Sequence, residues 1–178
     1  MSICFTMQKK NVLITGSPGI GKTALIKRIS HNLHYLALAG FYTEEIRDKG
    51  IRKGFSLVSL DGTRAMLSHV DIASRYRVGK YGVDVAAFND FLDHIAFFNP
   101  AVGGIIIDEI GKMECISDKF NELLKRILDQ ERTVIATISG KGEGIIEEIK
   151  KRPDVKLFLM TQDNRNSLLP EILNLIHS

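Results

Sequence analysis

The stretch from Gly16 to Thr23 constrains the fold of this chain more than any other part of the sequence. It reads Gly-Ser-Pro-Gly-Ile-Gly-Lys-Thr and matches the pattern G-x-x-x-x-G-K-[ST] of loops that bind nucleotide phosphates. A short apolar run of strand type precedes it at 11–15. After it, apolar residues recur at helical spacing at Leu25, Ile26, Ile29 and Leu33. The pattern therefore predicts a buried strand, a phosphate-binding loop and a helix in succession.

The residue types of this loop suit the binding of phosphate. Backbone N–H groups of the loop and of the helix N-terminus are expected to point at the anion, where the helix dipole favours negative charge. The residues expected to surround the phosphates are Gly16, Ser17, Pro18, Gly19, Ile20 and Gly21, of which all but Pro18 carry a backbone N–H. Lys22 can reach the β- and γ-phosphates, and Thr23 can ligate Mg²⁺.

A second landmark is the apolar run at 102–107, which ends in Asp108 and Glu109. A continuously apolar run is typical of a strand that is buried on both faces of a parallel sheet. Ligands of such sheets lie beyond the carboxyl ends of the strands. Asp108 is therefore expected to hold Mg²⁺, directly or through water, and Glu109 to orient and activate an attacking water molecule. The alternative is a strand that ends in ordinary surface charge.

The remaining pattern predicts an α/β fold of three layers with a mainly parallel sheet. Segments 39–46, 52–60 and 63–67 are joined by short turns, so we expect antiparallel strands that extend one edge of the sheet. A polar loop is expected at 75–83. Further strands are expected at 133–139 and 155–160, and helices at 21–34, 84–99, 117–130, 144–151 and from 166 onward.

Length and composition indicate a single domain over 1–178. Residues 1–10 are expected to be a loose extension, and Met7 could be the natural start. The net charge of +3 is too small to argue for nucleic acid. Cys4 and Cys115 are far apart and form no metal-type pair, which favours a reduced, cytoplasmic location. No apolar run approaches the length of a membrane span. The oligomeric state is not fixed by the sequence, and a monomer is the default expectation.

The chain resembles the P-loop nucleoside-triphosphatases first described from thermophiles, the family that includes the human cancer-related nucleoside-triphosphatase. Three blocks carry the resemblance: 16–23, then 40–47 with Gly50, Arg52 and Gly54-Phe55, then 107–114. One local departure is Leu38, where the family pattern suggests glycine. The resemblance implies a fold similar to RecA-like and AAA-type ATPases. It also implies magnesium-dependent hydrolysis of ATP, GTP, CTP and UTP to the diphosphate and phosphate.

Two other functions compete with hydrolysis at this stage. A nucleotide or small-molecule kinase would need an acceptor pocket and a basic lid, for which Arg75, Arg77 and Lys80 are candidates. A regulatory GTPase is suggested because 108–111 matches D-x-x-G, although no Asn-Lys-x-Asp stretch is present to read guanine. Glu109 favours the hydrolase, because hydrolysis requires a positioned water molecule.

Five polar side chains outside the two landmarks are further candidates. Arg47 is the arginine we expect at the γ-phosphate, since it belongs to the family-specific block. The alternative is a surface arginine paired with Glu44 or Glu45. Asn164 and Arg165 follow the last strand and are expected near the base or ribose, the alternative being a helix-capping loop. Two hydroxyl residues at the end of the strand at 133–139 could sense the γ-phosphate or serve the core, namely Thr137 and Ser139.

Overall fold

The computed structural model describes residues 11–177, and within them nine strands form one sheet in the order β5-β6-β4-β3-β2-β7-β8-β1-β9. The strands are β1 (Asn11–Gly16), β2 (Leu38–Asp48), β3 (Ile51–Ser59), β4 (Arg64–His69), β5 (Arg77–Val78), β6 (Tyr81–Val83), β7 (Gly104–Ile110), β8 (Thr133–Ile138) and β9 (Val155–Met160). The helices are α1 (Lys22–Asn32), α2 (Val85–Asp93), α3 (Asp118–Leu128), α4 (Ile145–Lys150) and α5 (Leu168–His177), with a short 3-10 helix η1 (Glu114–Ile116). The predicted extension at 1–10 lies outside the described residues.

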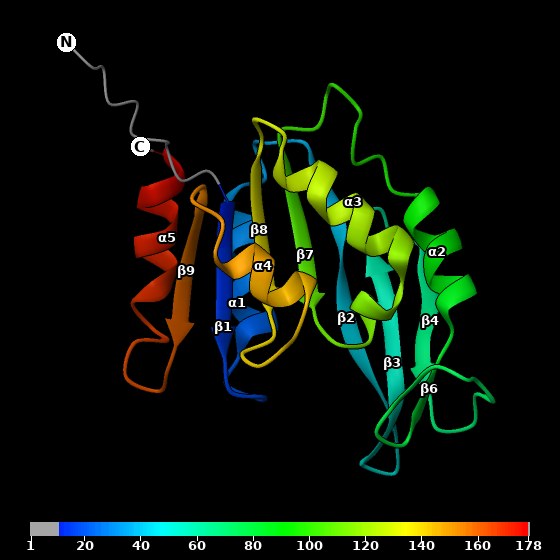
Figure 1. The fold of residues 1–178 in the computed structure, drawn as a ribbon. Coiled ribbons are helices and arrows are strands. Elements are labelled where there is room, and N and C mark those ends of the chain that lie inside the picture. The colour runs from blue at the N-terminus through cyan, green and yellow to red at the C-terminus, as the bar shows by residue number, and fades with distance from the viewer. Residues whose placement is uncertain (1–10, 178) are drawn as a thin grey trace.

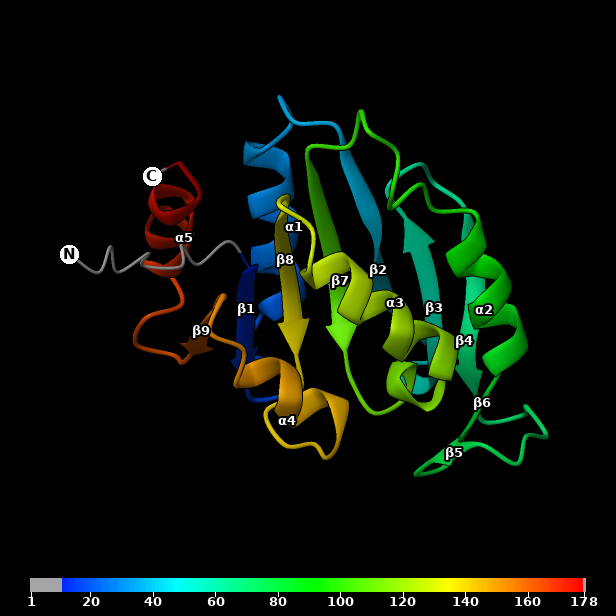
Figure 2. The ribbon, with the colours of Figure 1, turned by 45° about the horizontal axis from the view of Figure 1, so that its top comes forward.

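The half of the sheet that contains β2, β7, β8, β1 and β9 is parallel. Its central strands, β1, β7 and β8, are buried almost throughout because helices cover both of their faces. The segment Ile105–Ile107 in β7, for example, is fully buried. The carboxyl ends of these strands therefore meet at one edge of the sheet, as the arrowheads of β7 and β8 show in Figure 2.

The other half of the sheet is antiparallel and continues from β2 through β3, β4, β6 and β5. This arrangement confirms the predicted hairpin strands. The prediction that 75–83 is a loop is wrong in part, because β5 and β6 form there. Both strands are too short to show an alternating pattern, and they exist because β6 pairs with β4 at Ser68 and His69.

Close approach of β2 to β7 depends on Gly40. Its φ is 138°, and a Cβ at this position would lie 1.8 Å from the carbonyl oxygen of Ile106. Only glycine allows this contact without a backbone shift. Leu38, where the family pattern suggests glycine, begins β2 and pairs with Gly104. The departure is therefore accommodated at the start of the strand.

Helices cover the two faces of the sheet unequally (Figure 1). The face with α2, α3 and α4 has the larger core, where Phe41 packs against Phe88, Phe91 and Phe120 at centroid distances of 5.7–6.2 Å. The opposite face is covered by α1 and α5. These aromatic side chains on α2 and α3 are thus part of the core. The three layers confirm the predicted fold class.

Helix boundaries follow local capping chemistry. Asp84 begins α2, as predicted, and its Oδ1 accepts a hydrogen bond of 2.9 Å from the amide of Ala87. Ser117 caps α3 in the same way through the amide of Phe120. The prediction that the first of these helices extends to 99 is wrong, since α2 ends at Asp93 and turns follow. Between residues 11 and 177 no helix is long and apolar enough to cross a membrane.

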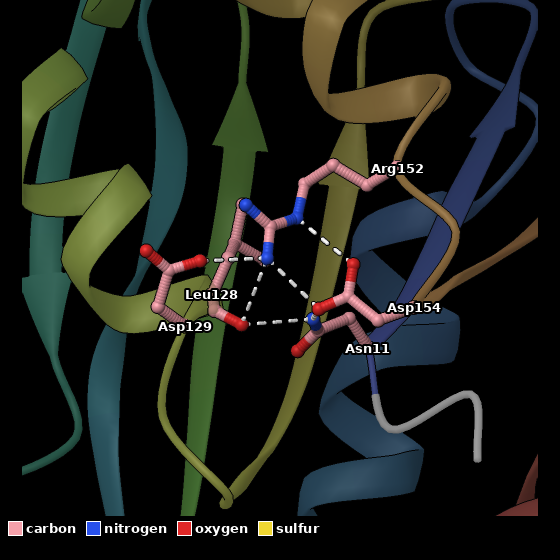
Figure 3. A network of polar contacts seen from close by, with 5 residues as sticks. All are labelled: Asn11, Leu128, Asp129, Arg152 and Asp154. Carbon is pink, nitrogen blue, oxygen red and sulfur yellow. Dashed lines mark hydrogen bonds and ion pairs between the residues drawn. The ribbon is translucent and has the colours of Figure 1, made fainter. Parts of the chain in front are cut away.

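A polar network joins the amino ends of β1 and β9 to the end of α3 (Figure 3). Arg152 donates to both carboxylate oxygens of Asp154 and to Oδ1 of Asp129, at 2.8–2.9 Å. Asn11 donates to Asp154 and to the carbonyl of Leu128. This network lies at the edge opposite the carboxyl ends of the parallel strands. It fixes β1 at its start, so the loop that follows β1 leaves from a rigid strand.

Candidate active site

The loop between β1 and α1 has the predicted strand–loop–helix geometry. Gly21 precedes α1 with φ 109°, a conformation that favours glycine. The Nζ of Lys22 donates to the carbonyl oxygens of Gly16 at 3.0 Å and Ser17 at 3.3 Å. The ammonium therefore lies over the loop. The free N–H groups at the start of α1 open on the same side, which is the arrangement that binds phosphate.

The acidic pair lies at the end of β7, across β8 from the phosphate-binding loop. Asp108 is 2% exposed, and its Oδ1 accepts a hydrogen bond of 2.5 Å from the hydroxyl of Thr137 on β8. Its other oxygen, Oδ2, is buried and has no partner among the described residues. A buried carboxylate oxygen without a partner is costly unless a ligand satisfies it.

The donor set around that oxygen fits Mg²⁺. Thr23 and Asp108 line one cavity, and both offer oxygen atoms, the ligands that this ion prefers. The described residues contain no group of three or more His, Cys, Asp or Glu side chains that could hold a metal by themselves. Mg²⁺ commonly combines one or two protein ligands with water and substrate phosphates. Thr23 and Asp108 are the residues that would hold it here.

Burial raises the pKa of both carboxyl groups. For Asp108 the hydrogen bond from Thr137, the nearby hydroxyl of Thr23 and the charge of Lys22 oppose this shift of the pKa. For Glu109 burial again raises the pKa, the positive charge of Lys22 lowers it, and the charge of Asp108 adds to the increase. A carboxylate whose pKa is raised is a stronger base for a proton from water.

A third carboxyl group, on Glu114, lies behind the pair and was not among the predicted site residues. Its side chain is 5% exposed, at the start of η1. Burial, with further contributions from the negative charges of Glu109 and Asp108, raises its pKa to about 8. The carboxyl accepts hydrogen bonds from the backbone amides of Gly111 and Glu114 itself. The sequence signal was present, since Glu114 belongs to the third family block, but its burial was not apparent.

Two cavities meet at the centre of the site. One has a volume of about 650 Å³ and extends from the phosphate-binding loop over Thr23 and Asp108 to the β2–β3 hairpin. The other has a volume of about 600 Å³ and extends from the loop toward the end of β8. Pro18, Lys22 and Glu109 line both. Glu109 and Lys22 thus lie at the junction of the two cavities, where one ligand group could reach both side chains.

The family-specific block forms the wall of the first cavity. Thr43 on β2 donates a hydrogen bond of 2.5 Å to the carbonyl oxygen of Asp108, and Glu44 pairs with Lys27 on α1 at 3.2 Å. These contacts join β2 to the acidic pair on β7 and to α1, the helix that follows the phosphate-binding loop. Thr43 and Phe55, which line this cavity, were missed as site residues, because the role of Thr43 depends on the pairing of β2 with β7.

Arg47 lies on the exposed part of the hairpin and is paired, as the alternative interpretation anticipated. Its guanidinium contacts Glu45 at 2.5 Å and the carbonyl of Gly50 at 2.8 Å, and its side chain is 53% exposed. Arg52 pairs with the same glutamate at 2.8 Å and is the arginine that lines the cavity. A role for Arg47 at the γ-phosphate stays a prediction, and it would require Arg47 to separate from Glu45.

The other candidates are placed as follows. Asn164 accepts from the amide of Thr161 and donates to the carbonyl of Leu159, both at 2.8 Å, so its side chain holds the turn after β9. Arg165 is exposed in the same turn. Their contact with the base or ribose stays a prediction. Thr137 is fully buried against Asp108, whereas Ser139 lines the second cavity.

The fold and this site define a P-loop NTPase. In the sheet, β8 separates the strand of the phosphate-binding loop from the strand of the acidic pair, and its Thr137 donates a hydrogen bond to Asp108. The model of the NTPase family matches residues 11–173, and the chain belongs to that family.

Relatives of known name agree with this assignment over nearly the whole chain. Nucleoside-triphosphatase THEP1 of Thermotoga sp. (strain RQ2) is 46% identical over 169 residues, which cover 93% of this chain and 94% of that protein. The human cancer-related nucleoside-triphosphatase is 40% identical over 185 residues, which cover 95% of this chain and 97% of that protein. The crystal structure of THEP1 from Aquifex aeolicus superposes with a TM-score of 0.82 at 35% identity, over 94% of this chain and 99% of that one. The solution structure of the human protein superposes with a TM-score of 0.77 at 39% identity, over 93% of this chain and 96% of that one.

Proposed function

We propose that this protein hydrolyses nucleoside triphosphates to the diphosphate and inorganic phosphate, with Mg²⁺ and with little selectivity for the base. The observation that carries the proposal is the position of Glu109, which lies beside the buried Asp108 and lines both cavities with Lys22. A carboxylate at this position can accept a proton from a water molecule that attacks the terminal phosphate. The names of the relatives, nucleoside-triphosphatases, support the same activity.

The roles of the residues follow from their positions. The loop amides and Lys22 bind the phosphates and fix their orientation. Glu109 orients the water and takes its proton, while Thr137 and Thr43 hold the acidic strand end in place. Thr23 and Asp108 would hold Mg²⁺, which when bound neutralises charge on the phosphate oxygens.

The proposal extends to two arginines at the periphery of the site. Arg165 could stack on a base through its guanidinium, which would tolerate any base because each has a π-face. Arg47 is proposed to approach the γ-phosphate after separating from Glu45. A cytoplasmic location also stays a prediction. Of the two cysteines on which it depends, Cys115 is a free thiol and Cys4 lies outside the described residues.

A kinase has less support in the structure. Of its proposed lid residues, Arg75 contacts the ring and hydroxyl of Tyr76, and Arg77 donates to the carbonyl of Lys80. None of these three basic residues lines either cavity at the phosphate-binding loop. The hydrolase is therefore the function that the geometry favours.

The proposal is tested by phosphate release from ATP, GTP, CTP and UTP, with and without candidate phosphate acceptors. We expect release from all four in the presence of Mg²⁺, loss of release with a chelator, and no stimulation by acceptors. Turnover that required an acceptor, with the phosphate recovered on it, would establish the kinase instead.

A further inference from the structure

Two lysines, Lys112 and Lys141, line the second cavity together with the phosphate-binding loop. Lys112 lies three residues after Glu109, just beyond β7, and Lys141 lies just beyond β8. Strands β7, β8 and β1 are neighbours in the sheet and are parallel, so the segments that follow them lie at the same carboxyl edge. Both lysines therefore lie at the edge of the sheet where Lys22 lies, and all three lysines line the second cavity, whose acidic residue is Glu109. Lys112 and Lys141 also line a neighbouring cavity, next to Glu143.

Neither of the two added lysines has a side-chain ion pair or hydrogen bond with any residue between 11 and 177. The hairpin arginines differ in this respect, since Arg47 and Arg52 both contact Glu45. A cation that is already paired must give up that pair before it binds a phosphate. Lys112 and Lys141 have no such cost, so their attraction for an incoming anion is undiminished.

A buried hydroxyl in the same cavity also requires a partner. Thr15 is 7% exposed, and its Oγ1 is buried without a hydrogen-bond partner in the described part of the chain. It lies in the cavity lining beside Gly16, the first residue of the loop. A ligand with several acceptor oxygens would satisfy this donor. Ser139 also lines the cavity. Its hydroxyl donates a hydrogen bond of 2.8 Å to the carbonyl oxygen of Lys141 and so holds the backbone of that lysine.

We infer that Lys112 and Lys141 form a cationic contact for the terminal phosphate of a bound nucleoside triphosphate, on the side of Glu109 that faces away from Asp108. This inference rests on the proposed function for the class of ligand. The pair would supply the positive charge at the γ-phosphate that an arginine supplies in many related enzymes. Both lysines are exposed and have long side chains, so rotation about their side-chain bonds can keep them in contact with the phosphate as its bond to the diphosphate breaks.

The test compares the affinities for a non-hydrolysable ATP analogue and for ADP, measured by calorimetry with Mg²⁺ at fixed ionic strength. Lys112→Ala and Lys141→Ala are each expected to weaken binding of the triphosphate about tenfold, because each removes one charged contact. Binding of ADP is expected to stay unchanged. Lys112→Arg should retain the preference for the triphosphate. The matched control is Lys151→Ala, which removes an exposed lysine that lines neither cavity.

Two results would overturn the inference. Equal losses of affinity for the triphosphate and the diphosphate would show that the lysines act only through the general field of the protein. No loss for the triphosphate in the Lys112→Ala, Lys141→Ala double variant would show that they do not contact the phosphate. Because the readout is binding, it is independent of turnover. The wild type could release no phosphate from any nucleotide while the lysine variants still lose affinity for the triphosphate and not for ADP. That result would contradict the proposed hydrolysis and not this contact.

Discussion

Replacing Glu114 by glutamine tests whether a neutral carboxylic acid is built into the core behind the acidic pair. The side chain is 5% exposed, and its pKa is raised to about 8, first by burial and then by the charges of Glu109 and Asp108. Glutamine has the same shape and keeps an oxygen for the amides of Gly111 and residue 114. It cannot ionise, so the variant isolates the effect of the proton.

The size of the effect on the free energy of unfolding follows from the interval between the ordinary pKa of 4.5 and the value of about 8 in the folded protein. Each pH unit in this interval corresponds to about 1.4 kcal/mol of differential stability, which gives an upper limit of about 5 kcal/mol. The folded state keeps the proton to a higher pH than the unfolded state. The stabilisation by Glu114 is therefore complete below about pH 4.5, declines as the pH rises, and is lost above about pH 8.

Urea unfolding between pH 5 and pH 9, with a chelator present, measures this effect. Wild type is expected to lose stability relative to Glu114→Gln across that range, at up to about 1.4 kcal/mol per pH unit. Glu143→Gln, which changes an exposed carboxylate, serves as the control and should follow wild type. Parallel curves for wild type and Glu114→Gln would show that Glu114 ionises normally, and the reasoning about its burial would then be refuted.

Four further predictions concern turnover and nucleotide binding. Lys22→Ala should lower turnover at least roughly a hundredfold with an unchanged unfolding curve; near-native turnover would contradict the assignment of the loop. Glu109→Gln should bind ATP but hydrolyse it roughly a hundredfold or more slowly in single-turnover assays, whereas Asp108→Asn should weaken magnesium-dependent binding. An unchanged rate of hydrolysis in Glu109→Gln would remove Glu109 from the mechanism. Arg47→Ala should lower kcat, by up to about a thousandfold if it contacts the γ-phosphate, with little change in the nucleotide Kd; an equal kcat at saturation rules the role out. Arg165→Ala should raise KM for all four nucleotides, and unaltered values would leave it a residue of the turn.

Much of the architecture is determined by local sequence patterns. The phosphate-binding loop requires its glycines, lysine and threonine at a fixed spacing, so Gly16 to Thr23 could be located without a structure. Strand β9 was predicted with its observed bounds, Val155–Met160, because a short, mostly apolar run with polar residues on both sides is a local signal. Asp84 could be identified as a helix cap for the same reason, since the bond it accepts comes from three residues away.

The composition of the site beyond these landmarks was decided by tertiary structure. Thr43 and Thr137 contact Asp108 across 65 and 29 residues, and only the strand order β2-β7-β8 brings them together. A register shift after Ile46 sets Arg47 opposite Arg52, so that both arginines reach the same glutamate.

Charge and protonation within the site were also beyond the reach of the sequence. Glu114 and Glu109 are both glutamates near the end of one strand, yet the fold encloses the first and places the second at the junction of two cavities. The free energy of ionisation depends on the surrounding dielectric and on nearby charges, which are properties of the packed structure. The sequence by itself determined which chemical groups the site contains, and the tertiary structure decided which of them are paired, buried or free to meet a phosphate.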